Sequence, residues 1–266
     1  QFAIGARRHP AHPNLILLKY NQIKSAMSMR IVQECRGIIL DEANDWNVVA
    51  RAFDKFFNYG EGHAAPIDWP TARVQEKLDG SLCVLYHYAD KWHVATSGSP
   101  DAGGNVGDQT FTFNDLFWAT FRDKQYELPD VLPASGHGEV HPDQNAWLRD
   151  HTFSFELTTK FNRIVVQHLQ PDLRLLAVRN RLTGEELNPA HFEHLYEIVK
   201  HYNLPARGLA GAPSLASLLS TFEKIDPIRQ EGYVVVDDQF NRIKVKHPGY
   251  VAIHHLKEGF GKSRFT

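Results

Sequence analysis

The segment Glu76-Lys77-Leu78-Asp79-Gly80-Ser81 places a lysine and an Asp-Gly pair between two strand-like runs. Asp-Gly is a strong hairpin-turn dipeptide, so one interpretation is a plain turn. The other is chemical, because a rigidly held lysine amine can act as a nucleophile and a nearby glycine lets the backbone approach a phosphate. The rest of the sequence decides between the two.

Three more charged motifs follow in apolar strands: Phe153-Ser154-Phe155-Glu156-Leu157, Glu231-Gly232-Tyr233-Val234-Val235 and Lys244-Val245-Lys246. A charged side chain in an apolar strand has a cost that a function would justify. Strand alternation is the simpler explanation for each, since two lysines can face solvent across a buried valine. One such coincidence is common, but four in this order favour the functional interpretation.

Apolar periodicity predicts antiparallel strands over residues 31–40, 48–53, 82–88, 93–96, 153–157, 173–178, 233–237 and 242–246. Helical spacing predicts helices over 114–124, capped by Asn114, over 190–202, and over 214–222 after a Gly- and Ala-rich loop at 206–213. Most strand connections are too short for parallel crossovers, so the fold class is α+β on antiparallel sheets.

Composition excludes several classes of protein. The 266 residues are 42% hydrophobic and 23% charged, as in ordinary globular domains, and the net charge is -2. A broad basic surface for duplex nucleic acid is therefore not expected. Two cysteines are too few for a disulfide framework, and no apolar stretch reaches the roughly 18 residues of a membrane span. We expect a cytoplasmic protein without membrane contact.

Six motifs in order carry a resemblance to a known family: Cys35-Arg36-Gly37-Ile38, Lys55-Phe56-Phe57-Asn58, Lys77-Leu78-Asp79-Gly80-Ser81-Leu82, Phe155-Glu156 with Asn162-Arg163-Ile164-Val165, Glu231-Gly232, and Lys244-Val245-Lys246 with Tyr250-Val251-Ala252. They resemble the phage RNA ligase 1 family across residues 30 to 257. The resemblance implies an antiparallel-sheet nucleotidyltransferase (adenylyltransferase) domain of the ATP-grasp-like covalent ligase type. It is expected to span residues 1–266, without the separate C-terminal domain of the phage enzyme.

The resemblance also implies a role for each matched residue. Lys77 is expected to carry AMP covalently, with the Glu76 backbone beside the adenine, and Glu156 to receive a ribose hydroxyl. Glu231 is expected to position a divalent metal. Lys244 and Lys246 are expected to hold the ATP phosphates and assist pyrophosphate departure. The remaining residues expected around the nucleotide lie in the two upstream motifs: Arg36, Lys55 and Phe57.

The implied activity is ATP-dependent joining of RNA 5′-phosphate and 3′-hydroxyl ends through a lysyl-adenylate and an RNA-adenylate, in RNA repair. The expected cofactors are ATP and Mg²⁺, with Mn²⁺ as a substitute, and the expected partners are single-stranded RNA ends. Two alternatives within the superfamily are a DNA ligase and an mRNA capping guanylyltransferase. A catalytically silent nucleotide- or RNA-binding module is an alternative of another class.

Overall fold

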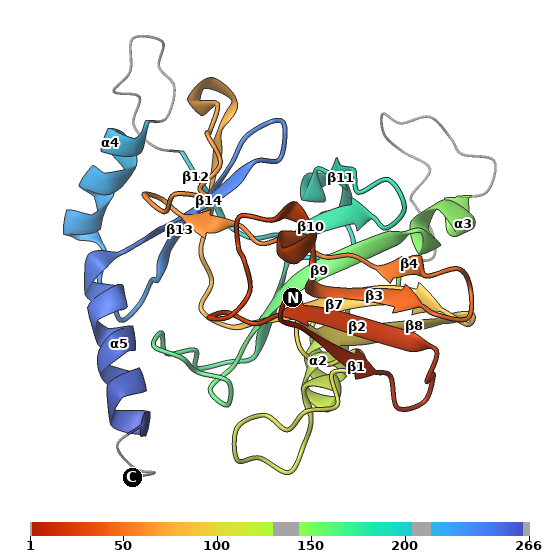
Figure 1. Ribbon diagram of the computed structural model, residues 1–266. Coiled ribbons are helices and arrows are strands. Elements are labelled where there is room, and N and C mark those ends of the chain that lie inside the picture. The colour runs from red at the N-terminus through yellow and green to blue at the C-terminus, as the bar shows by residue number, and fades with distance from the viewer. Residues whose placement is uncertain (1, 130–143, 204–213, 263–266) are drawn as a thin grey trace. The chain divides into compact units, whose positions relative to one another are not determined.

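The computed structural model describes residues 2–129, 144–203 and 214–262 (Figure 1). These residues form two compact units, each assembled from three stretches of chain. The first unit contains residues 1–55, 81–157 and 172–198, and the second contains 56–80, 158–171 and 199–266. No helix in the described part of the chain is long and apolar enough to cross a bilayer.

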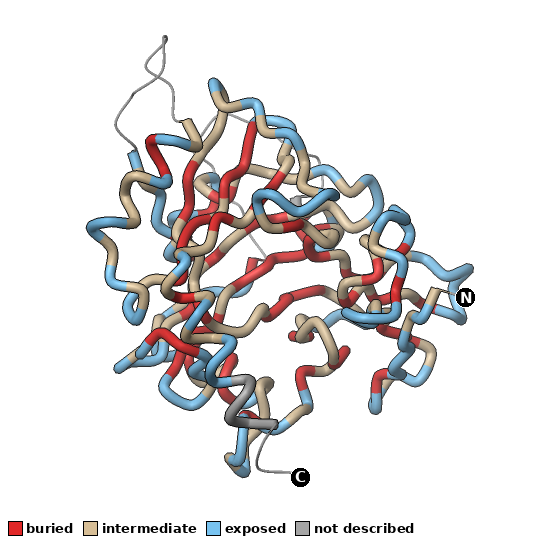
Figure 2. The backbone as a smooth tube through the Cα atoms, turned by 60° about the vertical axis from the view of Figure 1, so that its left-hand side comes forward, coloured by how far each residue is buried: buried red, intermediate tan, exposed pale blue. Residues whose placement is uncertain are grey.

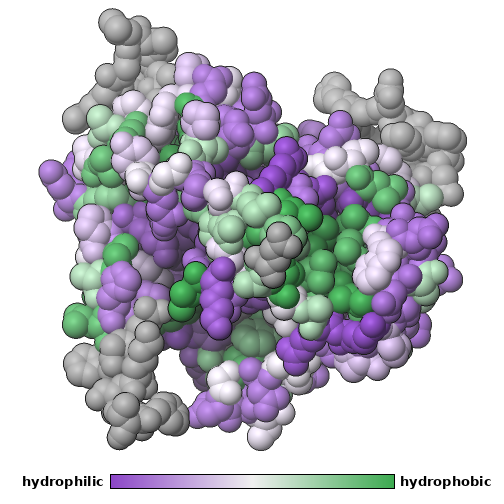
Figure 3. All heavy atoms as spheres, viewed as in Figure 1, coloured by the Kyte–Doolittle hydropathy of each residue, from purple (hydrophilic) through white to green (hydrophobic). Residues whose placement is uncertain are grey.

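An antiparallel four-stranded sheet opens the first unit, in the order β1 (Ile4–Arg8), β2 (Leu15–Tyr20), β3 (Arg36–Asp41) and β4 (Asn47–Ala50). Its inner face packs Leu15, Leu17 and Ile39 into a core shared with the strands β7 (Ser81–Tyr88) and β8 (Lys91–Thr96). Apolar residues also gather on the face that Figure 3 turns to the viewer, over β2, β3 and β4.

A five-stranded sheet completes the first unit, in the order β11 (Glu186–Leu187), β10 (Asp172–Asn180), β9 (His151–Thr158), β7 (Ser81–Tyr88) and β8 (Lys91–Thr96). Helix α2 (Phe113–Asp123) buries Phe117 and Phe121 in the core of this unit, and the short α3 spans Gln144–Arg149. A reciprocal capping box between Thr112 and Asp115 fixes the start of α2.

The second unit is built on a sheet in the order β12 (His201–Tyr202), β6 (Arg73–Glu76), β13 (Gly232–Val236), β14 (Arg242–Lys246) and β5 (Phe57–Asn58). The β14–β5 pair is parallel, and the other pairs are antiparallel. Four of the five residues of β13 are buried, and Figure 2 colours the buried stretches of the whole chain red. The second unit also contains two helices, α4 (Leu215–Leu219) and α5 (Pro248–Lys262), and two 3₁₀ segments, Trp69–Thr71 and Ser220–Lys224.

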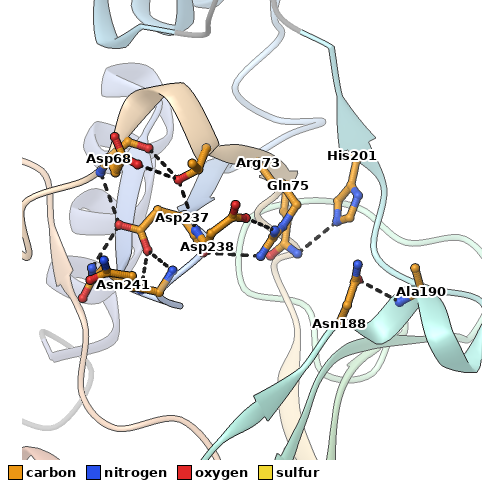
Figure 4. Close-up of polar contacts among 11 residues, drawn as sticks. Asp68, Arg73, Gln75, Asn188, Ala190, His201, Asp237, Asp238 and Asn241 are labelled. Carbon is orange, nitrogen blue, oxygen red and sulfur yellow. Dashed lines mark hydrogen bonds and ion pairs between the residues drawn. The ribbon is translucent and has the colours of Figure 1, made fainter. Parts of the chain in front are cut away.

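The turn between β13 and β14 is organised by one buried carboxylate (Figure 4). Asp237 accepts hydrogen bonds from the backbone of Asp68, Gln239 and Asn241 and from the Asn241 side chain, at 2.9–3.2 Å. The neighbouring Asp238 pairs with Arg73 at 2.7 Å. These contacts set the register of the hairpin that carries Lys244 and Lys246.

The antiparallel α+β class is confirmed, and most strands lie where the periodicity places them. Three predictions were incomplete: helix 114–124 begins instead after Thr112, residues 30–34 form the helix α1 (Arg30–Glu34) ahead of β3, and helix 214–222 divides into α4 and a 3₁₀ turn. The expected loop at 206–213 lies outside the described residues.

The helix predicted over residues 190–202 is wrong. A 3₁₀ turn at Pro189–Phe192 is followed by irregular chain and by β12. Carbonyls of this segment bond to strands, with Leu175 N–H donating to Glu197 at 2.9 Å and Glu76 N–H to Lys200 at 2.8 Å. Phe192, Tyr196 and Val199 are nevertheless buried. Successive turns of a non-helical chain can also direct every third or fourth side chain into a core, and this produces the same apolar spacing as a helix.

Candidate functional site

Lys77 follows directly after β6 in the second unit. The last residue of that strand, Glu76, pairs with Tyr233 of β13, and its N–H donates to the Lys200 carbonyl. The N–H of Lys77 donates to the Gly232 carbonyl at 3.0 Å. Backbone bonds on both sides therefore fix the root of the lysine side chain.

The Glu231 carboxylate lies between two ammonium groups. Its Oε2 accepts from Lys77 Nζ at 2.7 Å, and its Oε1 accepts from Lys246 Nζ at 3.0 Å. Glu231 is only 3% exposed, against 19% and 28% for the two lysine side chains. A buried charge requires such partners, and charged hydrogen bonds of this length are strong ones. The arrangement holds one carboxylate against the amine of Lys77.

Gly232 explains why a glycine follows that glutamate. Its φ of +143° is strained for any residue with a side chain, and an added Cβ would lie 2.3 Å from the Val245 carbonyl oxygen. The close approach of β13 to β14 at this point also allows the His247 N–H to donate to the Glu231 carbonyl at 2.8 Å. The Glu-Gly pair thus combines a charge with a backbone contact that only glycine permits.

The two lysines of β14 follow strand alternation, with Val245 buried between them, yet both contact aromatic rings. Lys244 Nζ lies 4.7 Å from the centre of the Phe56 ring, and Lys246 Nζ lies 5.6 Å from that of Tyr250. Both distances are within the range of a cation–π attraction. Alternation therefore places these ammonium groups on one side of the sheet, and the rings restrict them there.

Asp79, read from the sequence mainly as a turn residue, is a buried anchor. Its carboxylate accepts from Val165 N–H, Val166 N–H and the Tyr250 hydroxyl, each at 2.7 Å. These bonds tie the turn after Lys77 to the Asn162-Arg163-Ile164-Val165 motif and to α5. Asp79 and Tyr250 both lie in motifs of the sequence, but the sequence indicates no role for either residue, because their contact depends on the three-dimensional fold.

The other expected residues divide between the units. Phe57, in the second unit, is 6% exposed and packs near His63, so its ring is a core contact. Arg36, in the first unit, places its guanidinium 5.9 Å from the centre of the Phe53 ring. The two remaining expected residues also lie in the first unit. Lys55 has its Nζ 5.3 Å from the centre of the Tyr20 ring, and Glu156 of β9 is opposite Leu82 of β7.

The motifs that supply these side chains match a known family. The sequence profile of the RNA ligase family matches residues 34–250, which include Arg36, Lys77, Glu231 and both lysines of β14. The chain belongs to the RNA ligase family. All of the motifs that carried the resemblance begin inside the matched region, and only the last of them ends beyond it, at Ala252, so the family predicted from the sequence is confirmed.

Two relatives illustrate the family. A candidate bifunctional polynucleotide kinase/RNA ligase of Autographa californica nuclear polyhedrosis virus is 33% identical over 201 residues, covering 70% of this chain and 26% of the viral protein. An RNA ligase of Rhodothermus phage RM378 is 27% identical over 283 residues, covering 84% of this chain and 60% of its own length. This RNA ligase family chain therefore spans only part of each relative.

Solved structures show the same fold at low sequence identity. An archaeal ATP-dependent RNA ligase matches 99% of this chain and 68% of its own, with a TM-score of 0.57 and 12% identity. A structure named as a candidate ATP-dependent DNA ligase from Aquifex aeolicus matches 92% of this chain and 59% of its own, with a TM-score of 0.55 and 12% identity. The fold is that of the nucleotidyltransferase ligases.

Proposed function

We propose that this member of the RNA ligase family is an ATP-dependent enzyme that joins RNA 5′-phosphate and 3′-hydroxyl ends. The observation that carries the proposal is the contact of Lys77 Nζ with the buried Glu231 carboxylate, shared with Lys246. A lone strand lysine facing solvent would not need this environment. We take residues 1–266 as one nucleotidyltransferase domain with a cytoplasmic role in RNA repair.

In the first step, Lys77 Nζ attacks the α-phosphorus of ATP, a phosphorus–nitrogen bond forms, and pyrophosphate leaves. The amine must lose a proton to act as a nucleophile, and the Glu231 oxygen at 2.7 Å is positioned to accept one. Lys244 and Lys246 supply fixed positive charge for the phosphates, where negative charge accumulates as pyrophosphate departs. Phe56 and Tyr250 keep these two ammonium groups in place.

The remaining steps transfer AMP to an RNA 5′-phosphate and then release it as an RNA 3′-hydroxyl attacks. In this proposal Arg36, Lys55 and Glu156 of the first unit, together with the Glu76 backbone, serve the nucleotide and phosphate. Phe57 contributes as a buried residue of the second unit. With a net charge of -2, binding is expected to concentrate on a few phosphates, which favours single-stranded RNA ends over long duplexes.

Magnesium, with manganese as a substitute, is the metal of the proposal, and Glu231 is the residue that would hold it. Among the described residues there is no group of three or more His, Cys, Asp and Glu side chains with metal-binding geometry. Mg²⁺ is commonly held by one or two carboxylates together with phosphate oxygens and waters, so Glu231 fits as such a ligand once a lysine ammonium has moved from one of its two oxygens to the phosphates. The ion would supply charge neutralisation at the phosphates when bound.

Covalent labelling tests the proposal. The protein is incubated with α-labelled ATP and magnesium and run on a denaturing gel, beside Lys77→Ala and beside α-labelled GTP. We expect a label that is acid-stable, specific for ATP and absent from Lys77→Ala. Parallel assays on single-stranded RNA, nicked duplex RNA and nicked DNA should show that single-stranded RNA is joined fastest. GTP labelling, absence of labelling, or faster sealing of nicked DNA would contradict the proposal in favour of its alternatives.

A further inference from the structure

Two neighbouring strands of the first unit, β1 and β2, each bring a cation to the same turn, and a third strand, β3, pairs Arg36 with one of these cations. Arg7 of β1 is opposite Leu17 of β2, and Lys19 of β2 is opposite Arg36 of β3. Leu17 faces the core between the two sheets, so alternation directs Lys19 to that same face. The register of β2 and β3 shifts between Leu18 and Lys19, and such irregularities redirect side chains at strand ends.

The turn that receives these cations is Ser97-Gly98, which follows β8. Lys19 Nζ donates to the Ser97 hydroxyl at 3.3 Å, and Arg7 donates to the Gly98 carbonyl at 3.2 Å. Gly37, with φ of +92°, lies so close to the turn that an added Cβ would be 2.9 Å from Ser97 Cα. The backbone next to Arg36 is therefore packed directly on the residue that binds Lys19.

The electrostatics of Lys19 are unfavourable without an anion. In the part of the chain that the structure describes, its ammonium has one neutral hydroxyl as partner and no carboxylate. Partial desolvation and the nearby Arg36 guanidinium both lower the pKa of Lys19. The side chain is also exposed, so a ligand can reach it. A phosphate oxygen would neutralise the repulsion and hydrogen-bond to the ammonium and the hydroxyl together.

We propose that Lys19 and the Ser97 hydroxyl form a phosphate subsite beside Arg36. The inference rests on the proposed function and adds a residue that no sequence motif indicated. The ligand is a phosphate group, either of ATP or at the 5′ end of RNA. Lys19 lies in a strand that periodicity did not predict, so only its contact with Ser97 and its proximity to Arg36 reveal it.

The test compares Lys19→Gln and Lys19→Arg with the matched control Lys91→Gln. Lys91 is an exposed lysine at the opposite end of β8 from Ser97. Each protein is assayed for covalent labelling by ATP, for joining of 5′-phosphorylated RNA, and for joining of RNA that is already adenylylated. Binding of a 5′-phosphorylated oligoribonucleotide and of its 5′-hydroxyl counterpart is measured in parallel, and melting temperatures report folding.

We expect Lys19→Gln to lose about tenfold or more, in labelling if the subsite holds ATP, or in RNA joining and phosphate-specific binding if it holds the RNA end. Lys19→Arg should recover part of the loss, and Lys91→Gln should behave as wild type. Equal behaviour of Lys19→Gln and wild type in every arm, a loss shared by Lys91→Gln, or a loss matched by a lower melting temperature overturns the subsite. Failure of the wild-type protein to label with ATP would instead refute the proposed function.

Discussion

The Tyr250 hydroxyl donates a 2.7 Å hydrogen bond to the carboxylate of Asp79, 171 residues earlier in the chain. Asp79 is two residues after Lys77, and Tyr250 lies under the ammonium of Lys246. A closed circuit of contacts therefore runs from Lys77 through Glu231, Lys246 and Tyr250 back to the turn that follows Lys77. Displacing any member should move the lysine amine.

Asp79→Asn should impair both stability and adenylylation. The amide keeps one oxygen for the two backbone N–H groups, but it puts an N–H₂ group in place of the oxygen that accepts from Tyr250, and it removes the charge that strengthens all three bonds, at a cost of about 1–3 kcal/mol. Tyr250→Phe removes one bond and should cost about 1 kcal/mol. Urea unfolding and ATP labelling measure the two effects. An Asp79→Asn protein with wild-type labelling would show that the anchor does not position Lys77.

Glu231→Gln should reduce adenylylation by about a hundredfold or more, because the amide cannot accept a proton from Lys77 or neutralise two ammonium groups. Single-turnover labelling at several magnesium concentrations measures the rate. Glu61→Gln is a matched control, since Glu61 is an exposed carboxylate of the same unit, bonded to Asn58. Near-wild-type labelling by Glu231→Gln would show that Glu231 takes no part in adenylylation and serves only as an ion-pair partner of the two lysines.

Lys244→Ala should lower the labelling rate by about a hundredfold, whereas Phe56→Leu should lower it only several-fold. The first change removes a phosphate-binding charge, and the second removes a cation–π contact worth about 0.5–2 kcal/mol. Labelling over a range of ATP concentrations separates weaker binding from a slower reaction. If both variants label normally, β14 alternation alone explains the position of Lys244.

Gly232→Ala should destabilise the second unit by about 3 kcal/mol or more, because a β-carbon would overlap the Val245 carbonyl oxygen at a positive φ. Gly62→Ala is the matched control, since nothing lies within 4 Å of the position that its β-carbon would take. Thermal unfolding of both variants gives the comparison. Equal melting temperatures would contradict the close approach of β13 to β14.

The Asp237 network predicts acid sensitivity of the β13–β14 hairpin. Burial disfavours the charged carboxylate, but hydrogen bonds from Asn241, Asp68 and Gln239 outweigh it and hold the pKa of Asp237 below its usual value. A depressed folded-state pKa stabilises the protein above the unfolded value of about 3.9, and this contribution is lost as the pH falls below it. The measurement is the free energy of unfolding against pH.

Asp237→Asn should therefore be less stable than wild type at pH 7, and the difference should shrink below about pH 4. Asp238→Asn is the control, because Asp238 is 62% exposed and its ion pair with Arg73 should contribute little. A difference between wild type and Asp237→Asn that stays constant down to about pH 3 would contradict the role of the charge.

Periodicity predicted the strands that carry the motifs of Arg36, Glu156, Glu231 and Lys244, because those strands are buried on one face or both. It missed the short strands β5 and β6 beside Phe57 and Lys77. It also missed β1 and β2, where Leu15-Ile16-Leu17-Leu18 is continuously apolar and β1 is mostly exposed. The helix wrongly predicted over residues 190–202 shows a second limit of periodicity. The spacing of apolar residues indicates which side of a segment faces a core. It does not indicate whether the backbone hydrogen bonds form within the segment, as in a helix, or with neighbouring strands.

The charged motifs made Lys77, Glu231, Lys244 and Lys246 candidate site residues, because four charged motifs in this order, in or beside apolar strands, are rarely coincidental. Sequence could not give the pairing of Glu231 with both Lys77 and Lys246, nor the burial of Phe57, since both depend on how distant strands align. Asp79 looked like a turn residue because its partners lie in two remote segments. No local sequence pattern distinguished Lys19, and its proposed role rests on its hydrogen bond to a turn 78 residues away.

The interleaving of the two units has a consequence for biosynthesis. Lys77 and its carboxylate partner are 154 residues apart, and the second unit requires three separate stretches of chain. A ribosome that adds about 5–20 residues per second has exposed Lys77 for many seconds before Glu231 emerges. The nascent chain therefore cannot assemble the proposed site until Glu231 and β14 have been made, and products truncated before Glu231 should carry Lys77 without the ability to react with ATP.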